Sequence, residues 1–156
     1  MARRPSRIAV IGLGNTLMGD DGVGVQVVEG LKPLVEGPVD CVTGETAGMA
    51  LVGYFLEYDY VIVADAISAG SAPGAIFRFG PDEAGVMQLR SHNSHGMGIS
   101  YLVTAARLKG ADPKVRIFAV QVGDVSPRDH ELSPQVARAV PQAVRFILSE
   151  LGTISS

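Results

Sequence analysis

Three groups of ionisable side chains in this sequence have the chemistry of a metal site. The adjacent acids Asp20 and Asp21 follow the first apolar segment, Asp65 ends another, and His92 and His95 share one polar stretch. One acid of the pair, Asp65 and one of these histidines would supply two carboxylates and one imidazole. Such a set suits a borderline divalent metal with open water positions, such as zinc, nickel, manganese or iron.

The elements around these residues decide whether they meet. Residues 8–13, IAVIGL, form an apolar run without alternation, which is typical of a strand buried on both faces of a parallel sheet. Two glycines permit a tight turn after it, and apolar residues recur at helical spacing from Val23 onward. An acid at the start of that helix would favour its free N–H groups, so helix capping is the alternative role of Asp20 or Asp21.

The rest of the chain alternates between strands and helices. We expect further strands at residues 39–43, 60–64, 75–79 and 115–122, the strand at 75–79 lying at an edge, and further helices at residues 46–57, 99–110 and 133–151. Because proline disturbs a helix interior, we expect the last helix to have a short first turn and a main part that begins at Pro141.

This alternation predicts the fold class α/β. Right-handed crossovers would give one domain over residues 1–156, a three-layer sandwich in which a mostly parallel, twisted sheet has helices on both faces. The expected strand order, 2-1-3 with further strands beyond, makes the first and third strands neighbours whose helices leave to opposite sides. Ligands of open α/β sheets bind at such a switch point, where we place Asp20 or Asp21 and Asp65. Capping of its own loop is the alternative role of Asp65.

Composition excludes several classes of protein. The length of 156 residues predicts one domain, and the net charge of -3 gives no electrostatic case for nucleic acid or for an anionic membrane. The basic start MARRPSR precedes an apolar run too short for a signal sequence or a membrane span. The single cysteine, Cys41, excludes an internal disulfide. We therefore expect a cytoplasmic protein.

Common catalytic and nucleotide-binding motifs do not fit the chain. Gly12 and Gly14 match the first two glycines of G-x-G-x-x-G, but Leu17 holds the third position, and acids at the helix start would repel a pyrophosphate. The sequence contains no Gly-Lys-Ser/Thr of a P-loop, no H-E-x-x-H and no G-x-S-x-G. Spacing alone therefore leaves open which acid and which histidine form the site.

Three sequence blocks resemble the hydrogenase maturation endopeptidases, which trim the C-terminal tail of the large subunit of nickel–iron hydrogenases. The first block is GNTLMGDDGVG at residues 14–24, similar to the family's G-N-x-L-x-x-D-[DE]-x-x-G. The second is GETAGM at residues 44–49, followed by VADA at 63–66 and by Pro73-Gly74, and the third is SHGMG at 94–98. The resemblance covers essentially the whole chain.

The resemblance implies an activity and a set of site residues. In the family an acid of the first block, the aspartate that ends the third strand and the loop histidine bind nickel; by position these are Asp21, Asp65 and His95, both as catalytic residues and as metal ligands. Asp20 is left with the capping role. The implied enzyme is an aspartyl-type endopeptidase whose partner is the precursor of a hydrogenase large subunit. The nickel would belong to that precursor, so that cleavage follows metal insertion.

Other functions remain as alternatives. The same metal could act directly, by polarising the scissile carbonyl or by lowering the pKa of a bound water. A nickel-binding accessory protein would dock on the same precursor without cutting it, and a metal hydrolase would act on another peptide or amide. A nucleotide-binding module is the least favoured alternative.

Overall fold

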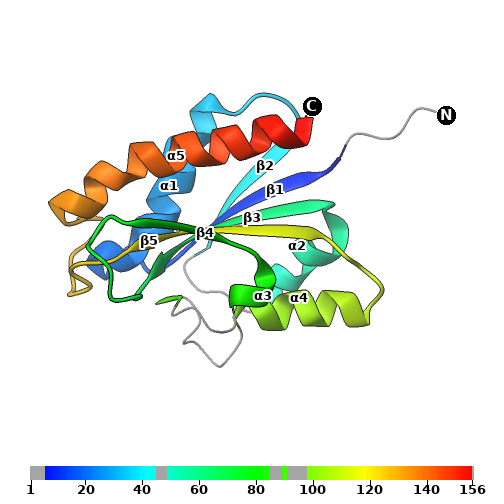
Figure 1. Ribbon diagram of the computed structural model, residues 1–156, viewed down its shortest axis with the longest axis horizontal. Coiled ribbons are helices and arrows are strands. Elements are labelled where there is room, and N and C mark those ends of the chain that lie inside the picture. Colours follow the sequence, from blue (N-terminus) through cyan, green and yellow to red (C-terminus); the bar gives the residue numbers. More distant parts are fainter. Residues whose placement is uncertain (1–5, 45–48, 85–88, 91–97, 156) are drawn as a thin grey trace.

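A five-stranded sheet lies between two layers of helices (Figure 1). The computed structural model describes residues 6–44, 49–84, 89–90 and 98–155. Their elements, with η for a 3-10 turn, are β1 (Ile8–Leu13), η1 (Gly19–Gly22), α1 (Val23–Leu31), η2 (Lys32–Leu34), β2 (Val39–Gly44), η3 (Met49–Leu51), α2 (Val52–Glu57), β3 (Tyr60–Ile67), β4 (Ile76–Phe79), α3 (Pro81–Ala84), α4 (Ile99–Leu108), β5 (Lys114–Gln121) and α5 (Pro134–Ser155).

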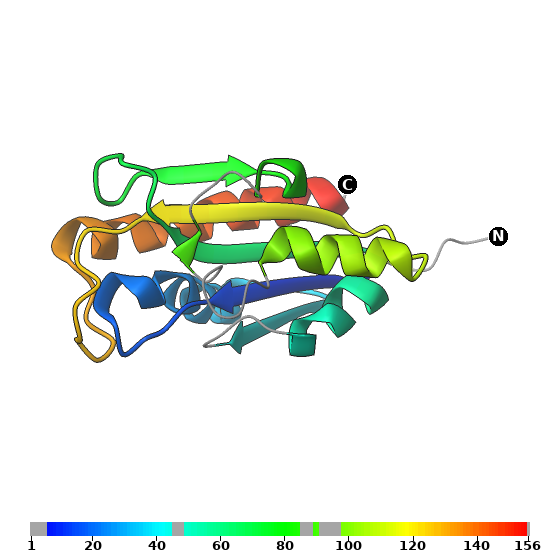
Figure 2. The ribbon, with the colours of Figure 1, turned by 90° about the horizontal axis from the view of Figure 1, so that it is seen from below.

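The order of the strands confirms the expected topology. They lie in the order β2-β1-β3-β5-β4, which Figure 2 shows from below. Strands β2, β1, β3 and β5 are parallel, and β4 pairs antiparallel with β5 at the edge. The first and third strands are therefore neighbours, and their carboxyl ends lie at the same edge of the sheet.

The helices cover both faces of this sheet, as the sequence predicts. Helices α1 and α5 pack on one face, and α2, α3 and α4 lie on the other (Figure 1). Each face has its own apolar core because successive side chains of the central strands alternate between the two layers. Along β1, Val10 faces α1 and α5, whereas Ala9 and Ile11 face α2 and α4.

Strand β3 runs further than expected, because Asp65 lies inside it and the strand ends at Ile67. The two sides of β3 differ at this point. Pairing with β1 stops at Gly12 and Ala64, whereas pairing with β5 continues to Ile67 and Gln121. Asp65 is thus the first residue of β3 beyond its pairing with β1. It lies at the switch point because this pairing stops before it, and not because the strand ends there, as expected.

The expected break at Pro141 is wrong, since α5 continues through this residue. Pro141 has no N–H to offer to the carbonyl of Ala137, but both residues are exposed, so water can satisfy that carbonyl. Buried residues on both sides of the proline hold the helix on the sheet; they include Val136, Ala139 and Val144. Tertiary packing outweighs the local preference here.

Among the described residues, no helix combines the length and the apolar character that a membrane span needs.

Candidate functional site

Helix α1 begins directly over the carboxyl ends of β1 and β3. A Cβ atom on Gly24 would lie 2.3 Å from the carbonyl oxygen of Ala64 and 2.5 Å from that of Leu13, so a side chain here would collide with both strands. The turn η1, which precedes α1 and carries Asp20 and Asp21, is therefore held at the point where β1 and β3 diverge.

Asp20 is fully buried and accepts four hydrogen bonds. Its Oδ2 accepts from the backbone N–H of Gly123 at 2.8 Å, from that of Asp124 at 2.7 Å, and from the hydroxyl of Ser133 at 2.7 Å. Its Oδ1 accepts from the backbone N–H of Ser133 at 2.7 Å. All four donors belong to the connection between β5 and α5, so this carboxylate ties that connection to η1.

The helix-capping role expected for Asp20 is therefore wrong. The residue before α1 is Gly22, and no side chain caps the start of η1 or of α1. Asp20 is directed instead toward donors that lie more than a hundred positions later in the sequence. A buried carboxylate is tolerated when hydrogen bonds to it replace those lost from water, and here such bonds are short and charge-assisted.

Asp21 has a different environment, although it is the next residue. Its side chain is 16% exposed and forms an ion pair with Arg90, whose side chain is 32% exposed, at 3.0 Å between Oδ1 and Nε. Its Oδ2 accepts a long hydrogen bond of 3.4 Å from the backbone N–H of Asn15. The carboxylate is thus partly open to solvent and is held mainly by one long side chain.

Arg90 is a residue of the site that no sequence pattern indicates. An isolated antiparallel bridge between Leu89 and Ile67 brings this segment to the end of β3, two residues beyond Asp65. Arg90 then reaches Asp21 on η1. The one sequence feature that could have indicated Arg90 is its position at the start of the stretch RSHNSHGMG, which contains the candidate histidines. This position does not indicate a partner 69 positions earlier in the chain.

Asp65 is fully buried at the same end of the sheet. One carboxylate oxygen accepts a hydrogen bond of 2.7 Å from the N–H of Ala66, the next residue. This bond is a local contact of the kind expected in the alternative role of Asp65, capping of its own loop. Contacts between η1 and β3 bring the turn with Asp21 against the strand that carries Asp65.

His92 and His95 lie outside the described residues, and both remain predictions from the sequence. The segments on either side are described: Arg90 contacts Asp21, and α4 begins at Ile99, which is buried. Within the described residues, no three histidine, cysteine, aspartate or glutamate side chains are grouped as metal ligands. The third histidine, His130, is largely exposed and pairs with its neighbour Asp129.

The connection that binds Asp20 carries its own electrostatic support. Asp124 accepts hydrogen bonds from the hydroxyl and the backbone N–H of Ser126, and these, helped by Arg128, hold the pKa of its carboxyl below the ordinary value. Asp124 also accepts, through its backbone carbonyl, a hydrogen bond of 2.8 Å from the N–H of Asp20. The segment is therefore folded around η1 by both backbone and side-chain contacts.

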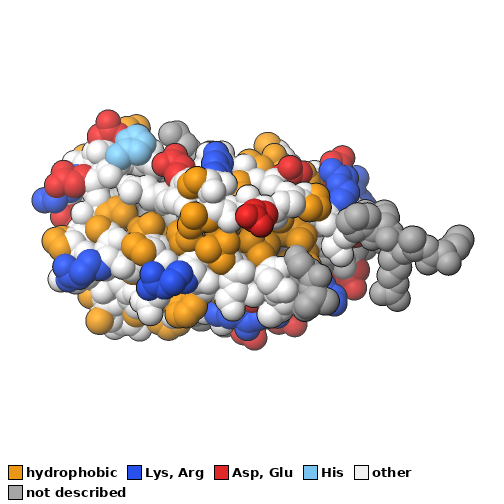
Figure 3. All heavy atoms as spheres, turned by 90° about the horizontal axis from the view of Figure 1, so that it is seen from above, with side chains coloured by type: hydrophobic (Ala, Val, Ile, Leu, Met, Phe, Trp, Pro, Cys, Tyr) orange, Lys and Arg blue, Asp and Glu red, His pale blue; other side chains and the backbone are white. Residues whose placement is uncertain are grey.

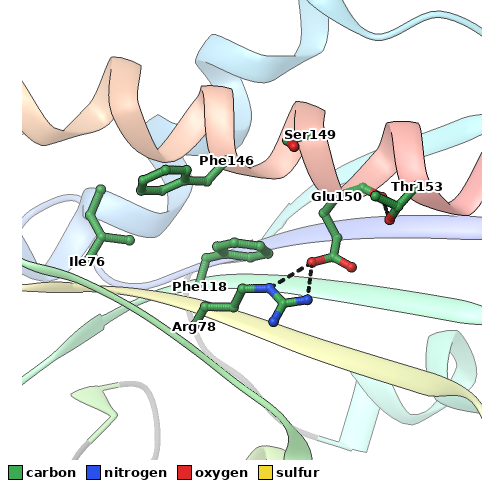
Figure 4. A pocket seen from close by; sticks show the side chains of 7 residues that line it. All are labelled: Ile76, Arg78, Phe118, Phe146, Ser149, Glu150 and Thr153. Atoms are coloured by element: carbon green, nitrogen blue, oxygen red, sulfur yellow. Dashed lines mark hydrogen bonds and ion pairs between the residues drawn. The ribbon is translucent and has the colours of Figure 1, made fainter.

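A cavity of about 450 Å³ lies elsewhere, between β4, β5 and α5 (Figure 4). Arg78 binds Glu150 there through Nε at 2.8 Å and Nη2 at 2.7 Å, and the hydroxyl of Tyr60 donates to the same carboxylate at 3.0 Å. Burial, and then the bond to Glu150, raise the pKa of Tyr60. This cavity holds none of the predicted site residues, and its polar groups fasten β4 and β3 to α5.

On the outer surface over α1 and α5, the charged side chains of the described residues are spread out (Figure 3). Seen from above, hydrophobic side chains gather along the middle of this face, with basic and acidic residues scattered around them (Figure 3). The exposed hydrophobic residues of the chain include Phe146 on α5. The acids of the predicted site, Asp21 and Asp65, lie instead on η1 and β3, at the switch point.

A family model described as hydrogenase maturation protease matches residues 25–150 of the chain. The hydrogenase 2 maturation protease of Escherichia coli (strain K12) is 33% identical over 149 residues, which cover 93% of this chain and 90% of that protein. A hydrogenase expression/formation protein, HupD, of Bradyrhizobium diazoefficiens is 33% identical over 161 residues, covering 97% and 82% respectively.

Solved structures agree with these sequence matches. The hydrogenase maturating endopeptidase HybD from Escherichia coli superimposes with a TM-score of 0.82 at 30% identity, and the match covers 94% of this chain and 93% of that one. The similarity thus extends over the sheet and both helix layers.

Proposed function

The chain belongs to the hydrogenase maturation protease family, and from this premise we propose that it removes the C-terminal extension of a nickel-loaded precursor of a nickel–iron hydrogenase large subunit. As a member of this family it is a peptide hydrolase. The precursor is its protein partner, and the metal enters the site as part of that substrate. We expect this reaction in the cytoplasm, without a nucleic acid or a membrane as partner.

One observation carries the proposal: a partly exposed acid, paired with an arginine, lies at the same end of the sheet as a buried acid. Asp21, held by Arg90, is on η1, and Asp65 is on β3 just beyond its pairing with β1. Carboxylate oxygen and imidazole are both ligands for a borderline divalent metal such as nickel. Asp21, Asp65 and His95 would then dock on the nickel of the precursor.

In this proposal the three side chains recognise the metal. Asp21 and Asp65 would each offer carboxylate oxygens, and His95 a ring nitrogen, to coordination positions that the precursor leaves open. A precursor without nickel would lack this contact, so it would not be placed for cleavage. The bound metal can also polarise a carbonyl group near it.

The test is the rate at which the protein processes a nickel-loaded precursor. We expect Asp65→Asn and His95→Ala each to lower this rate by about a hundredfold or more, since each loses a ligand at the reacting complex. His130→Ala is the matched control, because the side chain of His130 is exposed, pairs with its neighbour Asp129 and is not one of the proposed ligands.

Folding must be checked for Asp65→Asn, because Asp65 is fully buried. Circular dichroism and thermal unfolding of each variant would show whether the fold is kept. If folded Asp65→Asn or His95→Ala protein processes the precursor at the wild-type rate, that residue is not part of the site. A stable complex with the precursor whose mass never changes would instead favour an accessory protein.

A further inference from the structure

The carboxylate of Asp21 is already occupied by a positive charge from the protein itself. Arg90 Nε lies 3.0 Å from Asp21 Oδ1, and the hydrogen bond that this carboxylate accepts from the N–H of Asn15 is long at 3.4 Å. Arg90 therefore stands where a cation that binds Asp21 would have to compete. The two cannot both hold Oδ1 at close range without repulsion between like charges.

We propose that Arg90 is a specificity-determining residue that keeps free divalent cations out of the site and yields Asp21 only to nickel carried by the precursor. This inference rests on the proposed function, in which Asp21 docks on that nickel. Arg90 acts through Asp21, so it is a positioning residue and not a catalytic one.

The position of Arg90 supports an exchangeable contact. Its side chain is 32% exposed, so the guanidinium can return to water when it leaves Asp21. The residue before it, Leu89, is buried and forms the bridge to Ile67 at the end of β3. The backbone is thus anchored beside the site, while the long side chain is free to change its partner.

The selectivity follows from what each cation brings. A free cation must displace Arg90 and lose part of its own hydration. Only its contacts with the metal ligands offset these two costs in free energy. Nickel in a precursor arrives with the surrounding protein surface, whose contacts offset the loss of the ion pair. A contact that penalises the wrong ligand more than the right one produces specificity in this way.

The experiment measures binding of Ni²⁺ alone to the full chain by isothermal titration calorimetry. Arg90→Gln should bind Ni²⁺ about tenfold more tightly than the wild type, which corresponds to about 1.4 kcal/mol. Arg128→Gln is the matched control: it makes the same change in net charge near η1, but Arg128 pairs with Asp124 and Glu131. Its affinity should stay within about twofold of the wild type, since its charge does not contact Asp21.

A second variant shows whether the gain passes through Asp21. Adding Asp21→Asn to Arg90→Gln should remove the gain in affinity, because the freed ligand is then absent. A purely structural role of Arg90 would lower the affinity or leave it unchanged, and would not raise it. Equal affinities of Arg90→Gln and Arg128→Gln for Ni²⁺ would overturn the inference.

Failure of this inference can be told apart from failure of the proposed function. If Arg90→Gln gains no affinity while Asp21→Asn still fails to process the precursor, only the role of Arg90 is refuted. If folded Asp21→Asn and Asp65→Asn both process the precursor normally, the docking of these acids on nickel is refuted, whatever the calorimetry shows.

Discussion

Asp20 and Asp21 are neighbours in sequence but have opposite environments. Asp20 is fully buried and receives four hydrogen bonds of 2.7–2.8 Å, three from backbone N–H groups and one from a hydroxyl. Asp21 is partly exposed, and its shorter contact comes from the long side chain of Arg90. The donors of Asp20 are mostly backbone groups of one connection, whereas the closer partner of Asp21 is a partly exposed side chain.

The difference separates an acid with a structural role, Asp20, from an acid whose carboxylate is accessible to a metal, Asp21. A carboxylate enclosed by fixed donors cannot accept a metal without breaking the connection between β5 and α5. A carboxylate held by one flexible cation can exchange that cation for another. Asp20 thus maintains the loop geometry that presents Asp21, and the predictions below probe this division of roles in order of decreasing effect.

The largest effect is expected for Asp20→Asn. An amide in place of the carboxylate would direct an NH₂ group at some of the donors and leave others unpaired. We expect a loss of about 3 kcal/mol or more in the free energy of unfolding, measured by urea denaturation. Asp129→Asn, at an exposed acid, is the control and should change stability by less than about 0.5 kcal/mol. A loss no larger than that of the control would show that Asp20 is not a structural tie.

Gly14→Ala should also destabilise the protein, through the loop that carries both acids. Gly14 has a φ of 132°, and a Cβ atom there would lie 2.0 Å from the carbonyl oxygen of Asp21. We expect a loss of about 2 kcal/mol or more, together with loss of processing, because Asp21 must shift. Gly37→Ala also has a positive φ but no neighbour within 4 Å, so it should cost only about 1–2 kcal/mol and leave processing intact. Equal effects at the two glycines would contradict this explanation.

Asp21→Asn should separate stability from activity. Removing a partly exposed ion pair changes the free energy of unfolding by less than about 1 kcal/mol. Processing of a nickel-loaded precursor should nevertheless fall by about a hundredfold or more, because a proposed ligand is lost. Thermal unfolding and a processing assay on the same sample test both parts. A large loss of stability would place Asp21 with Asp20 among the structural acids.

The smallest effect concerns the pH dependence of the connection that binds Asp20. Hydrogen bonds from Ser126 lower the pKa of Asp124 in the folded protein, so its charged form stabilises the fold above its ordinary pKa of 3.8. This contribution to stability is lost as the pH falls through the lowered pKa of Asp124 in the folded protein. The difference in melting temperature between wild type and Asp124→Asn should therefore shrink as the pH falls below the ordinary pKa of 3.8. Ser126→Ala should weaken this pH dependence, and a difference that stays constant would refute the cause.

The sequence predicted most of the fold because its periodicity is strong. The apolar strands, the edge strand and the order of the central strands follow from local patterns together with the handedness of crossovers. Pro141 was misjudged because packing on both sides of it, which local preference does not reveal, keeps α5 continuous. The end of β3 was misjudged because pairing with β5 extends it after pairing with β1 has stopped.

The site was predicted less completely, because its contacts join distant parts of the chain. Sequence spacing brought Asp20 or Asp21 to the same edge as Asp65, and only the family resemblance selected Asp21. The donors of Asp20 and the partner of Asp21 lie 69 to 113 positions away, so no local pattern indicates them. His95 lies outside the described residues, so its part in the site stays a prediction.

The most direct test of the account is the intact mass of a hydrogenase large-subunit precursor before and after incubation with this protein, with nickel-loaded and nickel-free precursor side by side. The account predicts that wild-type protein removes a C-terminal peptide from the loaded form alone, and that folded Asp21→Asn protein removes none. Equal cleavage of the nickel-free precursor, or cleavage by Asp21→Asn at the wild-type rate, would contradict recognition of nickel through Asp21.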